Sequence, residues 1–517
     1  MKLRHILMLF AGLIILASSV NAQPIIEILN PQNGSTVISE SISLKVNTNE
    51  EAVCYYELCG GSGNGGWCGR EKEMSLTGGT YHRDIITDLQ NTGDDGFYRV
   101  DLTCQNGNGE GEQSSRFYVD LKLYLAKPFM PLESCGILNQ EGVAYRLMND
   151  LYSNDTCFTI LGDNIELNLN GYTIEGNGRG FGIRAEDSDY LIIRDGTIKN
   201  FEMVIQLTLD SSHSLIDSIT GINTEYGIDL NGGEGHIVGN NNLQSNRFGL
   251  FMSRIKDSYI EENIIIGNED GIRCSNCINV NIEENTITNN TDWAIFISGD
   301  SHLNTIDSNI VTHNGDGIIL TSGPTNNVIS NNEIGFNVYG LDHVGIGLYH
   351  DSLNNEIIGN EIFSQERGIW IWADSHSNSI TENTLRLNQQ PLLIHDSKYN
   401  RVFGNWFLDN EYSLSFGSRV INNLIYNNYF KNYHDPYLVS SGVNLFNIGR
   451  TNGKNIIGGQ VLGGNYWANP YGTGFSETCS DGDKDGFCDD IKNLGGDNID
   501  YLPLSKFQLQ TFIPKSP

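Results

Sequence analysis

Acidic side chains recur at regular intervals, just before a glycine, in the second half of the chain. The clearest examples are Glu269, Asp292, Asp316 and Glu366, and Arg367 directly follows the last of them. Two carboxylates at a fixed separation can cleave a glycosidic bond, and acids that seat calcium beside an arginine base can eliminate across one. Turns also favour aspartate for structural reasons, and side chains at turns point into solvent. These five residues are therefore weak catalytic candidates, and we expect no single acid-to-amide change to abolish an activity.

The segment CSDGDKDGFCDD near the C-terminus has the D-x-D-x-D-G spacing of a calcium-binding loop. The expected oxygen donors are Asp481, Asp483, Asp485, the Phe487 carbonyl and Asp489. Position 12 of the loop is Lys492 instead of glutamate, and no flanking helices are evident, so the segment departs from an EF-hand. We expect a structural calcium ion here, and the alternative is an acidic solvated loop.

Tryptophan alternates with isoleucine in the segment Gly-Ile-Trp-Ile-Trp, residues 368–372. Because successive strand residues point to opposite faces, the isoleucines are expected to turn inward and the tryptophans outward. Aromatic rings exposed on one face suit the C–H faces of sugar rings. The expected carbohydrate-binding strip consists of Trp370, Trp372, Tyr349, His395 and Phe296. The alternative is that a loop or the N-terminal module packs over this strip.

Asparagine repeats with a period near 22 residues from Asn241 to Asn428, and a Gly-apolar-x-apolar motif follows at a near-constant distance from Gly227 to Gly368. This period, with short apolar runs and no helical spacing, predicts an all-β chain. The expected architecture is a single-stranded right-handed parallel β-helix of about 11–12 coils, each contributing about three short strands. A side-chain amide can donate to one coil and accept from the next, so we assign the asparagines a structural role.

Residues 23–122 alternate apolar and polar side chains between turn signals, which predicts a small β-sandwich. The stretches STVISESISLKVNTNEEAVCYYEL and GFYRVDLTCQNGNGEGE resemble immunoglobulin-like modules of archaeal and bacterial surface proteins. That resemblance implies that Cys54 and Cys104 join the two sheets, which leaves Cys59 and Cys68 to close the glycine-rich loop. A spacer or adhesive role, with a possible protein partner, is expected for this module.

The ten cysteines favour disulfides in an exported protein. Besides the four in the N-terminal module, they form three local groups: Cys135 with Cys157, Cys274 with Cys277, and Cys479 with Cys488. The grouping favours pairs within modules, although the connectivity is not fixed by sequence. The CSNC segment offers only two sulfurs, which favours a disulfide or buried thiols over a metal site.

The segment from ESCGILNQEGVAYRLMNDLYSNDTCFTI through NIELNLNGYTIEGNGRGFGI and the repeats resembles β-helix proteins of the pectin-lyase-like superfamily, in particular NosD-like exported proteins. The NosD resemblance implies a periplasmic, copper-related role. Copper sites need clusters of His, Met or Cys, and we find no copper site in the sequence. The expected segments are a signal peptide (1–22), the sandwich (23–122), an N-terminal cap (123–160), the β-helix (161–442) and a C-terminal cap and tail (443–517).

The first residues have a basic start, an apolar run and a small-residue end, as in a secretory signal, and the alternative is an uncleaved membrane anchor. No other stretch is apolar enough to span a bilayer. The net charge of −32 disfavours nucleic acid and anionic lipid as partners. We expect a secreted, cell-surface or periplasmic protein that binds neutral or cationic glycans.

The sequence leaves three functions open. The first is carbohydrate binding through an exposed face of the β-helix. The second is a polysaccharide lyase or glycoside hydrolase that uses the stacked acids. The third is a structural or adhesive surface protein. The β-helix scaffold itself does not decide among them, because it hosts many activities.

Overall fold

The computed structural model describes residues 25–30, 35–37, 42–48, 52–62, 65–68, 72–74, 81–86, 96–106, 109–119, 129–208, 211–338, 342–438 and 442–506. The chain divides into two compact units, Met1–Pro128 and Phe129–Pro517. The expected signal peptide lies outside the described residues. Within them, no helix is both long and apolar enough to cross a membrane.

The first unit contains two small sheets whose inner faces share one apolar core. Its strands are β1 (Ile26–Asn30), β2 (Ser35–Val37), β3 (Ile42–Thr48), β4 (Val53–Ser62), β5 (Gly65–Cys68), β6 (Lys72–Glu73), β7 (Tyr81–Ile86), β8 (Gly96–Asn106) and β9 (Gly109–Val119). One sheet has the order β1-β3-β7, and the other has β2-β9-β8-β4-β5 with β6 on β4. Leu44 and Val46 of the first sheet and Val100 and Leu102 of the second are buried in the common core.

The Cys54–Cys104 disulfide forms, but it does not join the two sheets as we expected. The two cysteines face each other directly on the paired strands β4 and β8 of one sheet. The Cys54–Cys104 disulfide therefore lies within one sheet, unlike the intersheet bond that the resemblance to an immunoglobulin-like module implied. Cys59 is also disulfide-bonded, and the β4–β5 register places Cys68 opposite it; the Cys68 side chain lies outside the described residues.

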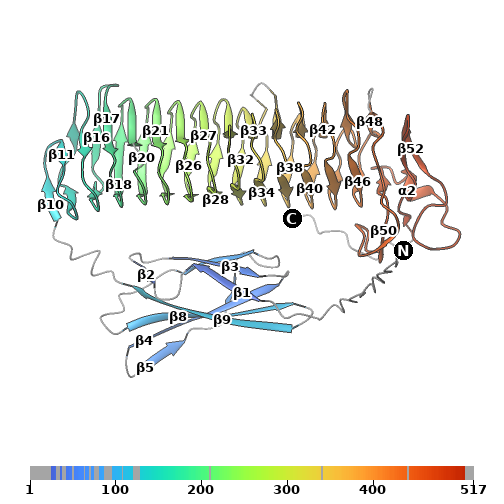
Figure 1. The fold of residues 1–517 in the computed structure, drawn as a ribbon, viewed down its shortest axis with the longest axis horizontal. Coiled ribbons are helices and arrows are strands. Elements are labelled where there is room, and N and C mark those ends of the chain that lie inside the picture. Colours follow the sequence, from blue (N-terminus) through green and yellow to red (C-terminus); the bar gives the residue numbers. More distant parts are fainter. Residues whose placement is uncertain are drawn as a thin grey trace, which may run out of the picture. The chain divides into compact units, whose positions relative to one another are not determined.

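The second unit is a parallel β-helix of about 13 turns, with its strands stacked in sequence order along its axis (Figure 1). One wall is a 14-stranded parallel sheet of β11 (Gly136–Leu138), β14 (Phe158–Ile160), β17 (Phe181–Glu186), β19 (Met203–Thr208), β21 (Tyr226–Asn231), β24 (Phe248–Ser253), β27 (Asp270–Ser275), β30 (Trp293–Ser298), β33 (Asp316–Thr321), β36 (Val344–Tyr349), β39 (Arg367–Ile371), β42 (Gln390–Ile394), β45 (Ser415–Phe416) and β48 (Tyr437–Leu438).

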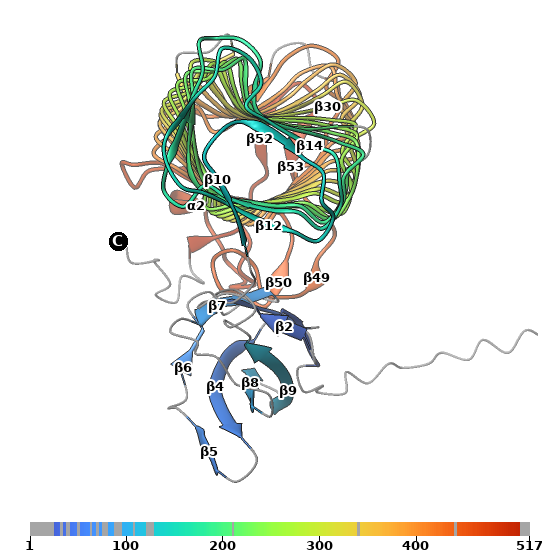
Figure 2. The same cartoon turned by 90° about the vertical axis from the view of Figure 1, so that its left-hand side faces the viewer.

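The other two walls form one 26-stranded sheet, to which most coils contribute two strands. Its strands are β10 (Phe129–Leu132), β12 (Ala144–Leu147), β13 (Leu151–Tyr152), β15 (Glu166–Asn168), β16 (Thr173–Glu175), β18 (Ile192–Lys199), β20 (Leu215–Ile222), β22 (Ile237–Gly239), β23 (Asn242–Gln244), β25 (Tyr259–Glu261), β26 (Ile264–Ile266), β28 (Asn281–Glu283), β29 (Thr286–Thr288), β31 (Thr305–Asp307), β32 (Ile310–Thr312), β34 (Val328–Ser330), β35 (Glu333–Gly335), β37 (Glu356–Ile358), β38 (Glu361–Phe363), β40 (Ser379–Thr381), β41 (Thr384–Arg386), β43 (Arg401–Phe403), β44 (Trp406–Leu408), β46 (Leu424–Tyr426), β47 (Tyr429–Lys431) and β51 (Tyr466–Ala468). The view along the axis shows these walls enclosing the space that the core side chains fill (Figure 2).

The parallel β-helix prediction is confirmed, with more turns than the 11–12 that we expected. Strands β10 to β14, within the segment expected to cap the helix, already pair in parallel with the following coils. The regular glycine and asparagine columns begin only at Gly227 and Asn241, so they do not mark these coils. Past the last regular coils lie β49 (Thr451–Asn452), β50 (Val461–Leu462), α2 (Phe475–Thr478), β52 (Lys492–Gly495) and β53 (Asn498–Asp500).

The asparagine column forms the predicted ladder. In each step the side-chain oxygen of one asparagine accepts from the backbone N–H and the amide of its counterpart in the preceding coil, as in Asn309 to Asn332 at 2.9 and 3.0 Å. The same amides also donate to strand carbonyls, as Asn332 does to Ile306. Two further ladders, which we had not identified, begin at Asn246 and Asn304. Repetition of asparagine thus provides hydrogen-bond partners for the buried backbone groups at the turns of the coils.

Candidate functional site

The 14-stranded sheet aligns the outward side chains of successive coils in rows. One row begins the strands and contains Phe248, Asp270, Trp293, Asp316, Val344 and Arg367. The next outward row contains Phe251, Arg273, Phe296, Ile319, Gly347 and Trp370. We call the following set the acidic–aromatic face: Asp270, Arg273, Asp292, Trp293, Phe296, Asp316, Tyr349, Arg367, Trp370 and Trp372.

Two carboxylates of this face are buried, contrary to the expectation that side chains at these turns point into solvent. Asp316 is 0% exposed, and its oxygens accept from the backbone N–H groups of Val344 and Asp342 at 3.1 and 3.4 Å. Asp270 is 2% exposed and lies 3.2 Å from Arg273. Burial raises the pKa of both carboxyls above the usual range, because an ionised acid loses hydration there.

Asp292 occupies the coil between those of Asp270 and Asp316 and is half-buried. Its pKa is raised to about 6, first by burial and then by the negative charges of Asp270, Asp316 and Glu269. A carboxyl that titrates near neutral pH can donate or accept a proton under physiological conditions. Asp292 therefore meets the chemical requirement for an acid–base group. Glu366 is partly exposed, and it pairs with His343 at 2.7 Å and with Arg367 at 3.1 Å.

The two tryptophans lie on the outer side of the sheet, as predicted, and Ile369 and Ile371 are fully buried in the core. Trp370 and Trp372 stack on each other, with ring centroids 5.4 Å apart and planes 17° apart. Trp370 pairs with Gly347 and Leu393 of the neighbouring coils, which confirms the expected register. Both rings are half-buried, so the strip is less open than we expected.

Tyr349 is not an exposed member of the strip, because only 5% of it reaches solvent. It packs with Ile319 and Val344 in a satellite apolar cluster under the two tryptophans. The Trp370 indole N–H is buried and makes no hydrogen bond with any described residue, whereas the buried Tyr349 hydroxyl has the Asp342 side chain as its hydrogen-bond neighbour. A buried polar atom without a partner is costly, so the Trp370 indole N–H is an unsatisfied donor of this face.

Guanidinium groups cover part of the aromatic surface. Arg367 lies 4.8 Å over the Trp370 ring, and Arg273 lies 4.8 Å from the ring centre of Phe296, which is half-buried. Cations over aromatic faces are favourable at such distances. His395, the remaining residue of the predicted strip, is half-buried in the next coil, where its Nε2 lies 3.0 Å from the Ser418 hydroxyl.

The aspartate-rich loop brings its carboxylates together. Oxygen atoms of Asp481, Asp483 and Asp485 lie within 4.8 Å of one another. Asp481 is 8% exposed, and Asp485 forms an ion pair with Arg450. Asp489 turns back to accept from the Gly482 N–H at 3.0 Å, and the Cys479–Cys488 disulfide closes the loop. The Phe487 side chain is buried in a small C-terminal cluster, which anchors the loop to the last coil.

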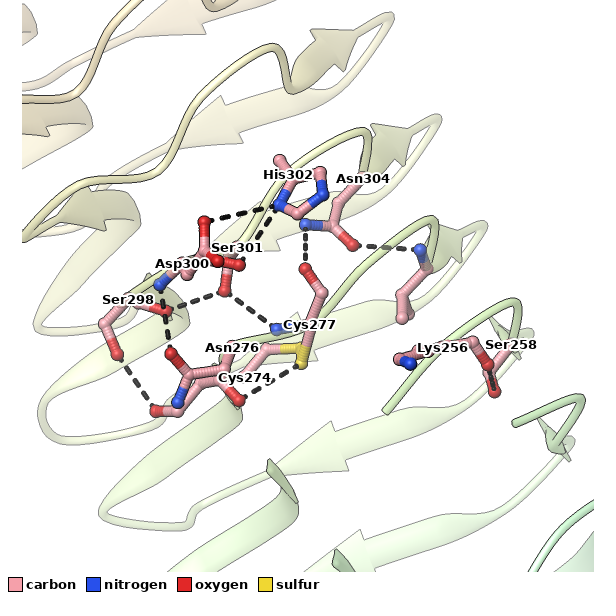
Figure 3. Close-up of a disulfide and its surroundings, with 12 residues drawn as sticks. Lys256, Ser258, Cys274, Asn276, Cys277, Ser298, Asp300, Ser301, His302 and Asn304 are labelled. Carbon is pink, nitrogen blue, oxygen red and sulfur yellow. Dashed lines mark hydrogen bonds and ion pairs between the residues drawn. A yellow bond between two sulfur atoms is a disulfide. The ribbon is translucent and has the colours of Figure 1, made fainter. Parts of the chain in front are cut away.

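The CSNC segment forms a disulfide between Cys274 and Cys277, and the Cys135–Cys157 pair is also bonded. Figure 3 shows the first of these with its polar surroundings: the Cys277 N–H donates to Ser301, and Asn304 donates to the Cys277 carbonyl. The sulfurs are fully buried. This motif is therefore part of the scaffold.

Sequence reasoning missed Arg273, Trp293 and Asp342 at the face. The signal for Asp342 was available, because the Gly317–Gly345 interval is 28 residues in a chain whose repeat is near 22. The extra residues precede β36 and place the Asp342 N–H against Asp316. Arg273 and Trp293 lie in the same rows as predicted site residues. They belong to neither the acidic column nor the Gly-Ile-Trp-Ile-Trp segment, so these two patterns do not identify them.

The fold and the ladders define a parallel β-helix protein. The sequence profile of the family described as periplasmic copper-binding protein (NosD) matches residues 161–343 and 330–472, more than half of the chain. The chain belongs to this family. No curated protein sequence matches it significantly.

Among solved structures, the chain is similar to the A-module of the Azotobacter vinelandii mannuronan C-5 epimerase AlgE6, with 15% identity, 59% of this chain and 90% of that chain covered, and a TM-score of 0.40. The periplasmic alginate epimerase AlgG shows 14% identity, covers 65% and 85%, and has a TM-score of 0.36. DFA-IIIase of Arthrobacter chlorophenolicus A6 shows 10% identity, covers 50% and 82%, and also has a TM-score of 0.36. At these identities the likeness concerns the fold.

The donors that this chain brings together do not fit copper. Copper prefers imidazole, thiolate and thioether ligands. Within the described part of the chain, the groups of His, Cys, Asp and Glu close enough to share an ion are Glu57, Cys59 and Asp101, and the three aspartates of the 481–485 loop. Neither contains a histidine, and Cys59 is already in a disulfide. Neither of these two groups offers the set of donors that copper prefers.

Proposed function

We propose that this protein is an exported carbohydrate-binding β-helix that holds a chain of neutral or amino sugars along the acidic–aromatic face. The observation that carries the proposal is the stacked, half-buried Trp370–Trp372 pair on the outer side of the 14-stranded sheet. Aromatic faces bind the C–H faces of sugars, and a few polar groups fix their orientation.

The charge of the face supports the choice of sugar. Besides burial, the negative charges of Asp270 and Asp316 raise the pKa of Asp292, and the chain as a whole has a net charge of −32. Carboxylates accept hydrogen bonds from hydroxyl and ammonium groups, whereas a polyuronate would bring further negative charge to the same place. Neutral and cationic polymers are therefore favoured.

The test is a glycan panel with a matched pair of variants. Trp370→Ala is expected to weaken binding of a panel ligand at least tenfold, because it removes half of the stacked pair. Trp406→Ala is the control: this half-buried tryptophan points outward from the 26-stranded sheet and packs 4.6 Å from Tyr429. Equal losses in both variants, or binding of polyuronates alone, would contradict the proposal.

A second candidate function is acid–base cleavage of the bound chain. Asp292, with its pKa of about 6 beside the buried Asp270 and Asp316, is the observation that favours it. Such a carboxyl can protonate a leaving oxygen while a second, ionised acid acts on the other side of the sugar. Reducing-sugar and unsaturated-product assays with Asp292→Asn, Asp316→Asn and Glu366→Gln decide the question. Product that disappears in a folded Asp292→Asn variant establishes the enzyme.

We further propose that the Asp481–Asp489 loop binds a structural calcium ion, supported by the convergence of the Asp481, Asp483 and Asp485 carboxylates. Three acids at such separations repel one another unless a cation lies between them. An exported location, in the periplasm or outside the cell, suits both the calcium and the disulfides. The N-terminal unit remains a candidate for a protein partner.

A further inference from the structure

An open groove of about 830 Å³ runs along the turns that precede β39 and β42 and along the corresponding turns of the next two coils. Its lining begins at Ser364 and Gln365, which come immediately before Glu366 and Arg367 in the chain. In the next coil, the lining residue Gln389 precedes Gln390, and Gln390 pairs with Arg367. The groove then crosses two further coils. Its full lining is Ser364, Gln365, Leu387, Asn388, Gln389, Asp409, Glu411, Tyr433, His434 and Tyr471.

The groove has exposed aromatic rings at its far end. Tyr433 is 50% exposed and Tyr471 is 73% exposed, and their ring centroids are 6.4 Å apart in an edge-to-face arrangement. Tyr471 follows β51, so a segment beyond the regular coils supplies one wall. Leu387 adds an exposed apolar side chain, and Asp409 and Glu411 add acids. Apolar rings beside a few hydrogen-bond acceptors are the same chemistry as at the tryptophans.

We propose that this groove is a second sugar subsite, and that the protein recognises a polymer by binding one chain across the tryptophans and the Tyr433–Tyr471 pair together. The inference rests on the proposed function and on the position of the groove, which begins in the coil of the tryptophans, just before Glu366 and Arg367. Three coils separate the Arg367 and His434 levels, which is about 14 Å at the spacing of stacked strands. A short oligosaccharide reaches one subsite, whereas a longer one reaches both and gains from their linkage.

The experiment compares oligomers of N-acetylglucosamine and glucosamine, as dimers and hexamers, so that one backbone supplies neutral and cationic probes of two lengths. Isothermal titration of the wild-type protein is expected to give at least tenfold tighter binding of the hexamer than of the dimer. Tyr433→Ala with Tyr471→Ala is expected to bring the hexamer affinity down to that of the dimer and to leave dimer binding unchanged. Both tyrosines are well exposed, so the melting temperature should stay the same.

Tyr152→Ala, which removes an equally exposed tyrosine from an early coil, is the control and should keep the length dependence. Equal affinities of the two lengths in the wild type, or a length dependence that survives the double change, would overturn the second subsite while leaving binding at the tryptophans intact. Failure of every probe to bind the wild type would overturn both proposals. Loss of dimer binding in Trp370→Ala alone identifies the tryptophans as the primary subsite.

Discussion

The asparagine ladders and the acidic–aromatic face use the same coils in opposite ways. In the ladders, each coil repeats one residue, and buried amides find a donor or acceptor in the next coil, as Asn383 does with Asn405. On the face, neighbouring coils carry different residues, and Trp370 Nε1 is buried without a partner among the described residues. Repetition of one residue therefore builds the scaffold, and the face is where neighbouring coils differ in residue type.

The largest effect is expected in a ladder. Asn332→Ala removes the acceptor of two bonds from Asn309 and the donor of bonds to Ile306 and Asn360. Buried groups left unsatisfied cost about 1–3 kcal/mol each, so the free energy of unfolding should fall by roughly 4 kcal/mol. Urea denaturation followed by circular dichroism measures it. The control is Asn281→Ala, at a half-buried outward position of β28, for which we expect a loss below about 0.5 kcal/mol.

The tryptophans should fall between these extremes. They point outward but are half-buried against Val344 and Tyr349, so Trp370→Ala with Trp372→Ala should cost about 2 kcal/mol, more than a surface change and less than an emptied core site. Thermal unfolding checks this. A change as costly as Asn332→Ala would show that the rings belong to the scaffold, and an unchanged stability would show that they are freer than their packing indicates.

A smaller, pH-dependent effect is expected at Asp292. Its pKa is about 6 in the folded protein and near 3.8 ordinarily, so the folded state holds a proton that the unfolded state releases first. Stability should therefore be highest below pH 4 with respect to this group and decline as pH rises through 6. Asp292→Asn should flatten part of this decline. Buried Asp500 also has a pKa of about 6, so it contributes to the same decline in stability. The contribution of Asp292 is therefore the difference between the stabilities of the wild type and the variant at each pH.

The smallest effect should come from the calcium loop, since it lies beyond the regular coils. Chelation should lower the melting temperature by a few degrees, consistent with the loss of one ligand from the folded state, or make the loop sensitive to protease. In Asp483→Asn the effect of the chelator should shrink. Identical melting and proteolysis profiles with and without chelator would contradict calcium binding by this loop.

The sequence was sufficient for the fold because its evidence was repeated many times. One asparagine column and one glycine motif, each holding the same period, established the coil, the inward isoleucines and the outward tryptophans. The site was harder, since each of its residues occurs once. Burial of Asp316 depends on the inserted residues before β36, and burial of Tyr349 depends on the side chains of three coils; neither follows from alternation within a strand. The intrasheet Cys54–Cys104 bond likewise depends on strand pairing that no local pattern specifies.

The first asparagine ladder ends at an aspartate, Asp500, instead of at another asparagine. Asn465 donates to Asp500, whose carboxylate also accepts from the Trp467 indole. An asparagine at that point would offer an amide to whatever came next, as every earlier coil does. An ionised carboxylate offers no hydrogen to pass on. This ladder therefore ends in a group that only accepts, whereas the ladders through Asn410 and Asn444 end in the asparagines Asn432 and Asn498.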